Sequence, residues 1–173
     1  MVNLKMISLK YCVVLGVLSF LFVSCEQEKT AYVNNTELIQ AYEKMKDAKN
    51  EFESRNEKLS KEFDSVAMNF QMQIQSYQEN IGGMKLSERE QEEERLIALR
   101  KKIENDQRQK SIKLEDESAS AADELVKEVR KKVEKYGEEN NYIYIFGSNE
   151  SANIMYAKRG KDITLEVIEY VNQ

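Results

Sequence analysis

The chain has 173 residues, of which 33% are charged and 41% apolar, and its net charge at pH 7 is −5. It contains no His and only two Cys, so the usual general base, nucleophile and soft metal ligands are scarce. Neither an enzyme nor a metal centre is therefore expected, and no cofactor. The acidic balance and the lack of a phosphate-cradling glycine motif argue against nucleic-acid binding.

The first 24 residues are expected to be a signal peptide. Lys5 and Lys10 give a basic start, and residues 11–23 are almost wholly apolar. A run of about 13 apolar residues suits a signal peptide, whereas a membrane span takes about 20. We therefore expect the mature chain to be exported.

Cys25 is the expected site of lipidation. Ser24 provides the small residue that lipoprotein processing requires before the Cys, although Phe22 stands where a Leu is usual. Because Cys12 leaves with the signal, Cys25 is the only mature thiol and no internal disulfide is expected. Residues 25–29 would then be a lipid-anchored linker to a membrane. The alternative is ordinary secretion, with Cys25 as a spare thiol.

The middle of the chain predicts one long helix followed by another. No Pro is present, and apolar residues recur at spacings of three, four or seven, which is typical of a helical coiled coil. The first stripe comprises Leu38, Tyr42, Met45, Phe52, Leu59, Phe63, Val66, Phe70, Ile74, Tyr77, Ile81 and Met84. The second comprises Leu96, Leu99, Ile103, Leu114, Ala121, Leu125, Val129, Val133 and Tyr136.

Glycines and a capping pattern mark the ends of these helices. Gly82 and Gly83 predict the turn of a hairpin, and Ser87 with Glu90 three residues later predicts the start of the second helix. Gly137 is placed to end that helix. A short connection makes the two helices antiparallel neighbours. Residues 36–137 are thus expected to form a long helical hairpin arm, with its tip near residues 82–86.

Short strands are expected on both sides of the arm. The segments Thr30–Asn34, Tyr142–Phe146 and Ala152–Ala157 are rich in β-branched and aromatic residues. Asp162 is expected to cap a final helix, whose apolar positions are Ile163, Leu165, Val167, Ile168 and Val171. The predicted fold class is α+β: residues 30–35 and 138–173 form a small β body, and the hairpin is an antiparallel coiled-coil arm.

These features together resemble the Skp/OmpH family of periplasmic chaperones. The resemblance covers Lys29 to Gln173, and its most specific part is the run from Tyr142 to Ile168, which includes Lys161-Asp162-Ile163-Thr164. It implies a homotrimer joined through its β bodies, with three arms around a cavity that holds unfolded outer-membrane proteins. A small sheet with open edges also favours such association. The residues expected in the trimerising body are Tyr32, Val33, Tyr142, Ile143, Ile145, Ile154 and Tyr156.

The end of the arm is the candidate client-binding site. Residues 66–78 carry no charge, and Met68 and Met72 fall off the apolar stripe. Methionine is flexible and polarizable, which suits contact with many different partners. The residues assigned to this site are Val66, Met68, Phe70, Met72, Ile74, Tyr77, Ile81 and Met84. For six of these residues the competing role is packing between the two helices. For Met68 and Met72 the competing explanation is that single apolar residues commonly occur on protein surfaces without a function.

The leading hypothesis is an ATP-independent holdase for unfolded envelope proteins, located in the periplasm and anchored by lipid to the outer membrane of a Gram-negative bacterium. The alternatives are a lipid-anchored structural spacer and an accessory subunit of an envelope assembly complex. One departure from the family concerns charge. Basic arms are frequent there, but residues 36–137 hold 20 Lys or Arg against 23 Asp or Glu. A lipopolysaccharide site is therefore not assigned.

Overall fold

The computed structural model describes residues 28–149 and 154–173. The signal peptide, Cys25 and most of the linker lie outside the described residues, so their assignments stay predictions. The elements in chain order are β1 (Thr30–Asn34), α2 (Asn35–Ala41), α3 (Glu43–Asn80), a 3-10 turn η1 (Ile81–Gly83), α4 (Leu86–Glu139), β2 (Tyr144–Ser148) and α5 (Thr164–Val171).

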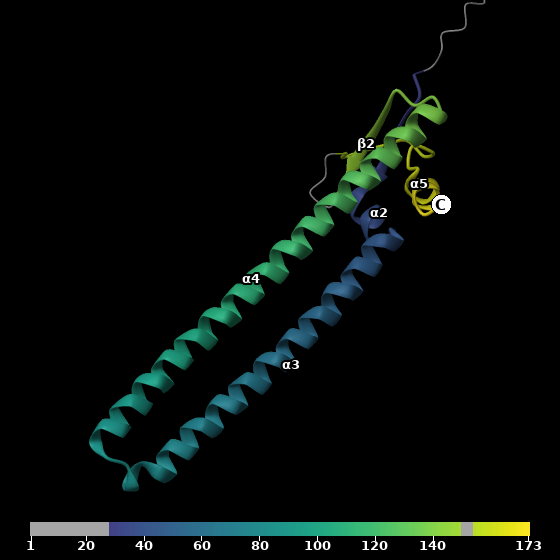
Figure 1. The fold of residues 1–173 in the computed structure, drawn as a ribbon. Helices are drawn as coiled ribbons and strands as arrows, with labels where there is room; N and C mark the ends of the chain where they lie inside the picture. Colours follow the sequence, from purple (N-terminus) through teal and green to yellow (C-terminus); the bar gives the residue numbers. More distant parts are fainter. Residues whose placement is uncertain (1–27, 150–153) are drawn as a thin grey trace, which may run out of the picture.

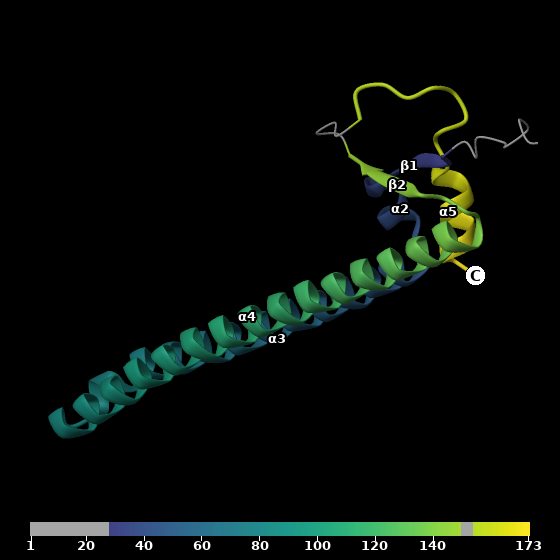
Figure 2. The same cartoon turned by 90° about the horizontal axis from the view of Figure 1, so that it is seen from above.

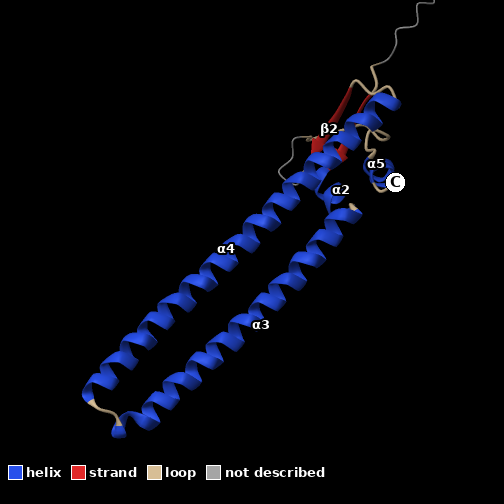
Figure 3. Ribbon diagram, viewed as in Figure 1, coloured by secondary structure: helices blue, strands red, loops and turns tan. Residues whose placement is uncertain are grey.

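A long helical hairpin and a small body make up the molecule (Figure 1; Figure 3). Helices α3 and α4 run side by side and are joined at their far end by η1. At 1.5 Å per residue, the 38 residues of α3 span about 57 Å and the 54 residues of α4 about 81 Å. Figure 2 shows the strands and α5 gathered at the open end of the hairpin. The predicted arm on a small body is confirmed.

The sheet of the body has β1 at its centre. Strand β2 pairs with β1 in parallel, from Thr30↔Tyr144 to Asn34↔Ser148. On the other edge of β1, the Tyr32 N–H donates to the Lys161 carbonyl at 2.8 Å, and the Ile163 N–H donates to the Tyr32 carbonyl at 3.0 Å. The whole arm is thus the crossover connection between two parallel strands, which need a long one.

The motif Lys161-Asp162-Ile163-Thr164 joins β1 to the final helix. The Lys161 ammonium donates to the Thr30 carbonyl at 2.8 Å, and the Asn34 N–H donates to Thr164 Oγ1 at 2.9 Å. Asp162 Oδ1 accepts from the Thr164 N–H at 3.0 Å and from its hydroxyl at 2.6 Å. Asp162 therefore bonds the first residue of α5, but the N-cap position falls at Ile163, one residue later than predicted. Each residue of the motif has a bonding or packing role.

Two strand predictions need correction. Strand β2 begins at Tyr144 rather than Tyr142, because Tyr142 still closes the end of α4 by donating its N–H to the Gly137 carbonyl at 2.9 Å. The predicted third strand does not form over its described part, since residues 154–157 are irregular. Residues 152 and 153 of that segment lie outside the described residues.

The helix ends also differ from the prediction. Helix α4 begins at Leu86, and Glu88 rather than Glu90 accepts the cap hydrogen bond, from the Lys85 N–H at 2.9 Å. Gly137 does not end α4, which continues to Glu139. The left-handed backbone that closes the helix falls at Asn141, with φ of 58°. Asn tolerates this conformation better than most residues, and Gly137 is instead buried against Ile145.

The first arm helix is interrupted, which the apolar stripe does not predict. Tyr42 separates α2 from α3 with an extended backbone, ψ of 120°, although it lies on the stripe and is 1% exposed. Asn172, next to the last residue of the chain, accepts from the Glu43 N–H at 2.8 Å and donates to the Ala41 carbonyl at 3.2 Å. A residue distant in sequence therefore satisfies both ends of the break.

The arm is held by its apolar seam and by ion pairs that span it. Every residue of both predicted stripes is buried or half-buried. Ion pairs link Lys44 to Glu128, Arg55 to Glu117, and Lys110 to Glu62. In all three pairs the residue numbers add to 172, so the two helices keep one register over most of the arm.

A single cluster of buried side chains unites the body with the root of the arm. Residues from β1, α2, α4 and α5 contribute to it, together with Ile163, which precedes α5. Leu165 of α5 is not part of the cluster and is 76% exposed, contrary to the prediction. The cluster consists of Ala31, Val33, Leu38, Tyr42, Val129, Ile163, Val167 and Val171.

Candidate functional site

The far end of the arm reverses direction within residues 81–85. The Met84 N–H donates to the Ile81 carbonyl at 3.3 Å, and the Arg89 guanidinium donates to the Met84 carbonyl at 3.1 Å. Neither Gly82 nor Gly83 has a positive φ, and no atom outside the immediate chain lies within 4 Å of a Cβ built on either. Left-handed backbone is thus not what shapes this turn.

The structure separates the eight residues assigned to the arm end into two groups. Met68 is 66% exposed and Met72 is 57% exposed. They stand one helical turn apart, so they are neighbours on the surface of α3. The others are half-buried and belong to the apolar stripe: Val66, Phe70, Ile74, Tyr77, Ile81 and Met84.

Two further apolar side chains at the arm end are exposed, and they were not assigned from the sequence. Leu86 is 72% exposed and Ile97 is 56% exposed. Leu86 follows the turn directly, and Ile97 follows the stripe residue Leu96, which is buried. The available signal for Ile97 was its position off the helical stripe, the same signal that singled out Met68 and Met72.

Two polar contacts join the helices across the arm end. Arg95 donates to the Gln73 amide oxygen at 3.0 Å and pairs with Glu92 at 2.6 Å, and this hydrogen bond lowers the Glu92 pKa. The Tyr77 hydroxyl donates to Glu93 at 2.5 Å, which raises the Tyr77 pKa. These contacts lock the two helices together and leave the methionines unengaged.

A second exposed apolar surface lies on the body. Tyr144 and Phe146 alternate with Ile145 along β2, so they point away from the core, and their rings stack with centroids 5.7 Å apart. Phe146 also lines a shallow groove of about 610 Å³ with Tyr32, Ile154 and Tyr156. We call this surface the outer body face; its exposed apolar residues are Tyr144, Phe146, Met155 and Tyr156.

Of the residues assigned to trimer contacts, Tyr32, Ile154 and Tyr156 line the groove of this face. Ile143 lies apart from it, beside Ile145 and Gly137. Ile143 and Tyr156 are exposed at 53% and 86%, whereas Val33 is 3% exposed and packs within the protomer. Ile145 packs against the core cluster and contacts Gly137. The half-buried residues are Tyr32, Tyr142 and Ile154. Tyr144, Phe146 and Met155 are exposed residues that the sequence reasoning missed.

No described helix is long and apolar enough to cross a membrane. Within residues 28–149 and 154–173, no group of three His, Cys, Asp or Glu side chains is arranged to hold a metal ion.

Comparison with known proteins identifies the family. A search of curated proteins finds no match. Among solved structures, the fold is similar to that of a candidate outer membrane chaperone (OmpH-like) from Caulobacter crescentus, with a TM-score of 0.75 and 11% identity over 84% of each chain. The model of the family "Outer membrane protein (OmpH-like)" matches residues 29–171. The chain therefore belongs to the OmpH-like family.

Proposed function

We propose that this protein is an ATP-independent holdase chaperone for unfolded outer-membrane or other envelope proteins. Family membership supports a chaperone-type role, as does the fold shared with the candidate chaperone from Caulobacter crescentus. The protein acts by binding and shielding apolar segments, and it catalyses no reaction and needs no cofactor.

The observation that carries this proposal is the exposure of apolar side chains at the arm end. Met68, Met72, Leu86 and Ile97 are all more than half exposed, whereas the stripe residues of the same helices are buried or half-buried. Flexible apolar side chains such as those of the two methionines favour weak contacts with many sequences. Several such contacts from several arms hold a client by multivalency, while each contact still releases quickly.

The protein acts as a homotrimer through the outer body face. Strand β2 has no partner on its outer edge among the described residues, and an open strand edge must be paired or covered. The stacked Tyr144 and Phe146, with Met155 and Tyr156, form an apolar surface of the kind that marks an interface. Threefold association covers this surface and directs three arms the same way around one cavity.

The protein is anchored by a lipid on Cys25 to the periplasmic face of the outer membrane of a Gram-negative bacterium. Only three residues, Glu26, Gln27 and Glu28, separate Cys25 from Lys29. The Lys29 ammonium donates to the Asn140 carbonyl at 2.8 Å and lies 4.0 Å from the centre of the Tyr142 ring. The linker thus reaches about 14 Å at most, so the body stays close to the bilayer.

The test is a holdase assay on the soluble form that begins at Glu26. An outer-membrane β-barrel protein is diluted from urea, its aggregation is followed by turbidity, and the mass of the chaperone is measured by light scattering. Suppression of aggregation by a trimer is expected. Absence of suppression at any molar excess contradicts the holdase and favours a structural spacer or a subunit dedicated to one partner.

A further inference from the structure

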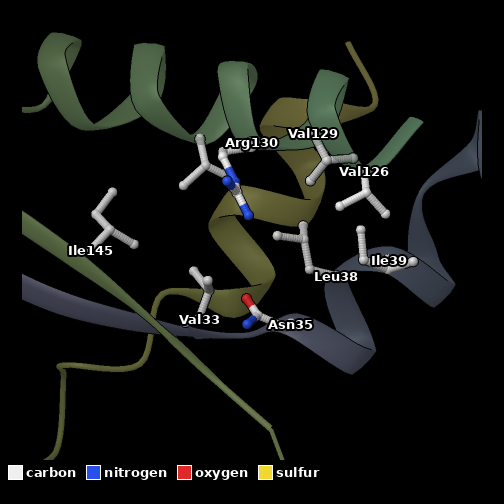
Figure 4. A pocket seen from close by; sticks show the side chains of 10 residues that line it. Val33, Asn35, Leu38, Ile39, Val126, Val129, Arg130 and Ile145 are labelled. Atoms are coloured by element: carbon white, nitrogen blue, oxygen red, sulfur yellow. The ribbon is translucent and has the colours of Figure 1, made fainter. Parts of the chain in front are cut away.

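A groove at the root of the arm lies between α2, α4 and the two strands (Figure 4). Its volume is about 360 Å³, within the usual range for small-ligand pockets. The arm-end site is far from it, at the opposite end of α3. Most of its lining is apolar and includes Val33, Leu38, Ile39, Val126, Val129 and Ile145.

One cation enters this apolar groove. Figure 4 shows the Arg130 guanidinium pointing from α4 into the groove, toward the side that holds Leu38 and Asn35. Within the described residues, Arg130 makes no hydrogen bond and no ion pair. Glu134, one turn further along α4, makes no ion pair with it either. Arg130 is exposed overall, but its guanidinium borders the apolar lining of the groove. An unpaired guanidinium beside apolar side chains favours an anion that also carries an apolar group.

The opposite wall adds a polar group. The carboxamide of Asn35 lies against Gly147, so closely that a Cβ at position 147 would be 2.4 Å from Asn35 Nδ2. Gly147 therefore makes room for Asn35 at the edge of the groove. The side chain of Asn35 makes no hydrogen bond among the described residues, which leaves its N–H groups able to donate to a ligand.

We propose that this groove binds the C-terminal end of a polypeptide whose last residues are apolar. Arg130 pairs with the terminal carboxylate in a bidentate manner, Asn35 donates to the same group, and the apolar walls receive the last side chain. A chain end suits the groove better than an internal Asp or Glu, because its carboxylate and an apolar side chain share one Cα. The proposed function supplies the source, since an unfolded client exposes its terminus; the binding itself does not depend on it.

The experiment measures peptide binding to the intact protein in lipid nanodiscs by fluorescence anisotropy. The probe is an N-terminally labelled hexapeptide that ends in Val-Leu with a free carboxylate. It is compared with the same peptide amidated and with one that ends in Ser-Ser. The variants are Arg130→Gln, Arg130→Lys, and Arg108→Gln as the control. Arg108 is an exposed arginine of the same helix and makes no hydrogen bond or ion pair with any residue that the structure describes.

Amidation and Arg130→Gln are each expected to weaken binding about tenfold or more, as loss of a charge-assisted hydrogen bond does. Arg130→Lys restores part of the affinity, and Arg108→Gln changes nothing. Equal binding of the acid and the amide overturns the proposal. The proposal is also overturned if Arg130→Gln weakens the binding of a labelled fatty acid but not of the peptide, because the groove is then an acyl-chain site. A change in oligomer mass in Arg130→Gln overturns it as well, because the groove is then an interface between copies.

Aggregation suppression measured on the same samples separates this proposal from the holdase function. Suppression without a preference for free carboxylates refutes the terminus site and leaves the chaperone intact. Carboxylate-dependent peptide binding without any suppression of aggregation supports the terminus site and refutes the holdase function.

Discussion

The side chain of Asn172 holds the backbone of Glu43, whose N–H donates to Asn172 Oδ1 at 2.8 Å, across 129 positions of sequence. The same carboxamide donates to the Ala41 carbonyl. The last turn of α5 thus caps the end of α2 and the start of α3. Lys132 of α4 reinforces this junction by donating to the Val171 carbonyl at 2.5 Å. The direction in which the arm leaves the body depends on these contacts.

Replacing Asn172 by Ala is expected to destabilise the body. The change leaves the Glu43 N–H and the Ala41 carbonyl without their partner, a loss of about 1 kcal/mol in the free energy of unfolding. Urea unfolding followed by circular dichroism measures it. Gln173→Ala, at the exposed next position, is the control and should match the wild type. An unchanged unfolding midpoint for Asn172→Ala would show that the hydrogen bonds of Asn172 to Glu43 and Ala41 contribute no stability.

Asp162 makes the stability of the body depend on acid. Partial burial alone would raise the pKa of this carboxyl, but hydrogen bonds from Thr164 and Tyr32 outweigh it, so the pKa lies below its ordinary value of 3.8. A carboxyl with a lowered pKa stabilises the fold above its unfolded pKa, and this contribution is lost as the pH falls below about 4.

Asp162→Ala should therefore lower the free energy of unfolding by about 1 kcal/mol at pH 7. Urea titrations at pH 7 and at pH 3 give the difference between variant and wild type at each pH. We expect that difference to be smaller at pH 3, because the contribution of the ionised carboxyl is progressively lost as the pH falls below about 4. Asp162→Asn, which keeps an acceptor without a charge, is the comparison. A deficit of the same size at both pH values would rule out this linkage.

The glycines of the arm have different sensitivities to substitution. A Cβ on Gly137 would lie 3.3 Å from Ile145 Cδ1, whereas a Cβ on Gly82 meets nothing within 4 Å. Gly137→Leu is expected to destabilise by about 1–3 kcal/mol, because it overpacks the contact with β2. Gly82→Leu should change stability by less than about 0.5 kcal/mol, as exposed sites generally do. Thermal unfolding distinguishes the two, and equal effects would count against the packing of Gly137 on β2.

The cross-arm ion pairs are expected to set register rather than to supply much stability. Lys110 and Glu62 are both about half exposed, and pairs of this kind are weak and screened by salt. Reversing Lys110 to Glu should lower the unfolding midpoint at low salt, and adding Glu62→Lys should restore it. High salt should remove both effects. A double variant no better than the single one would show that the pair does not interact.

The sequence predicts well the features that depend on local pattern. Strand β1 occupies the expected residues from Thr30 to Asn34, and the stripe residues line the seam, because alternation and helical periodicity are local signals. The features it misses depend on distant partners. Tyr42 keeps the helical period but is extended, since Asn172 caps the break. Gly137 has the composition of a helix end, but β2 packs against it within the helix.

The candidate site follows the same division. Periodicity alone places Met68 and Met72 off the seam, where the structure has them exposed. It does not separate the seam residues from a client-binding surface, because a half-buried side chain such as Phe70 can serve either role. The sequence pattern does not predict the exposure of Leu86, because that exposure depends on where the turn ends. The pattern places the start of the second helix at Ser87, whereas α4 begins at Leu86.

The central claim is that exposed methionines at the arm end bind unfolded clients, and one comparison tests it most directly. Aggregation suppression is measured for Met68→Glu/Met72→Glu beside Gln71→Glu/Gln78→Glu, which adds the same charge at exposed polar positions of the same helix segment. With helicity and oligomer mass unchanged, the methionine variant should lose most of its suppression and the glutamine variant should keep it. Equal suppression by both variants would contradict this account and place client contact elsewhere on the protein.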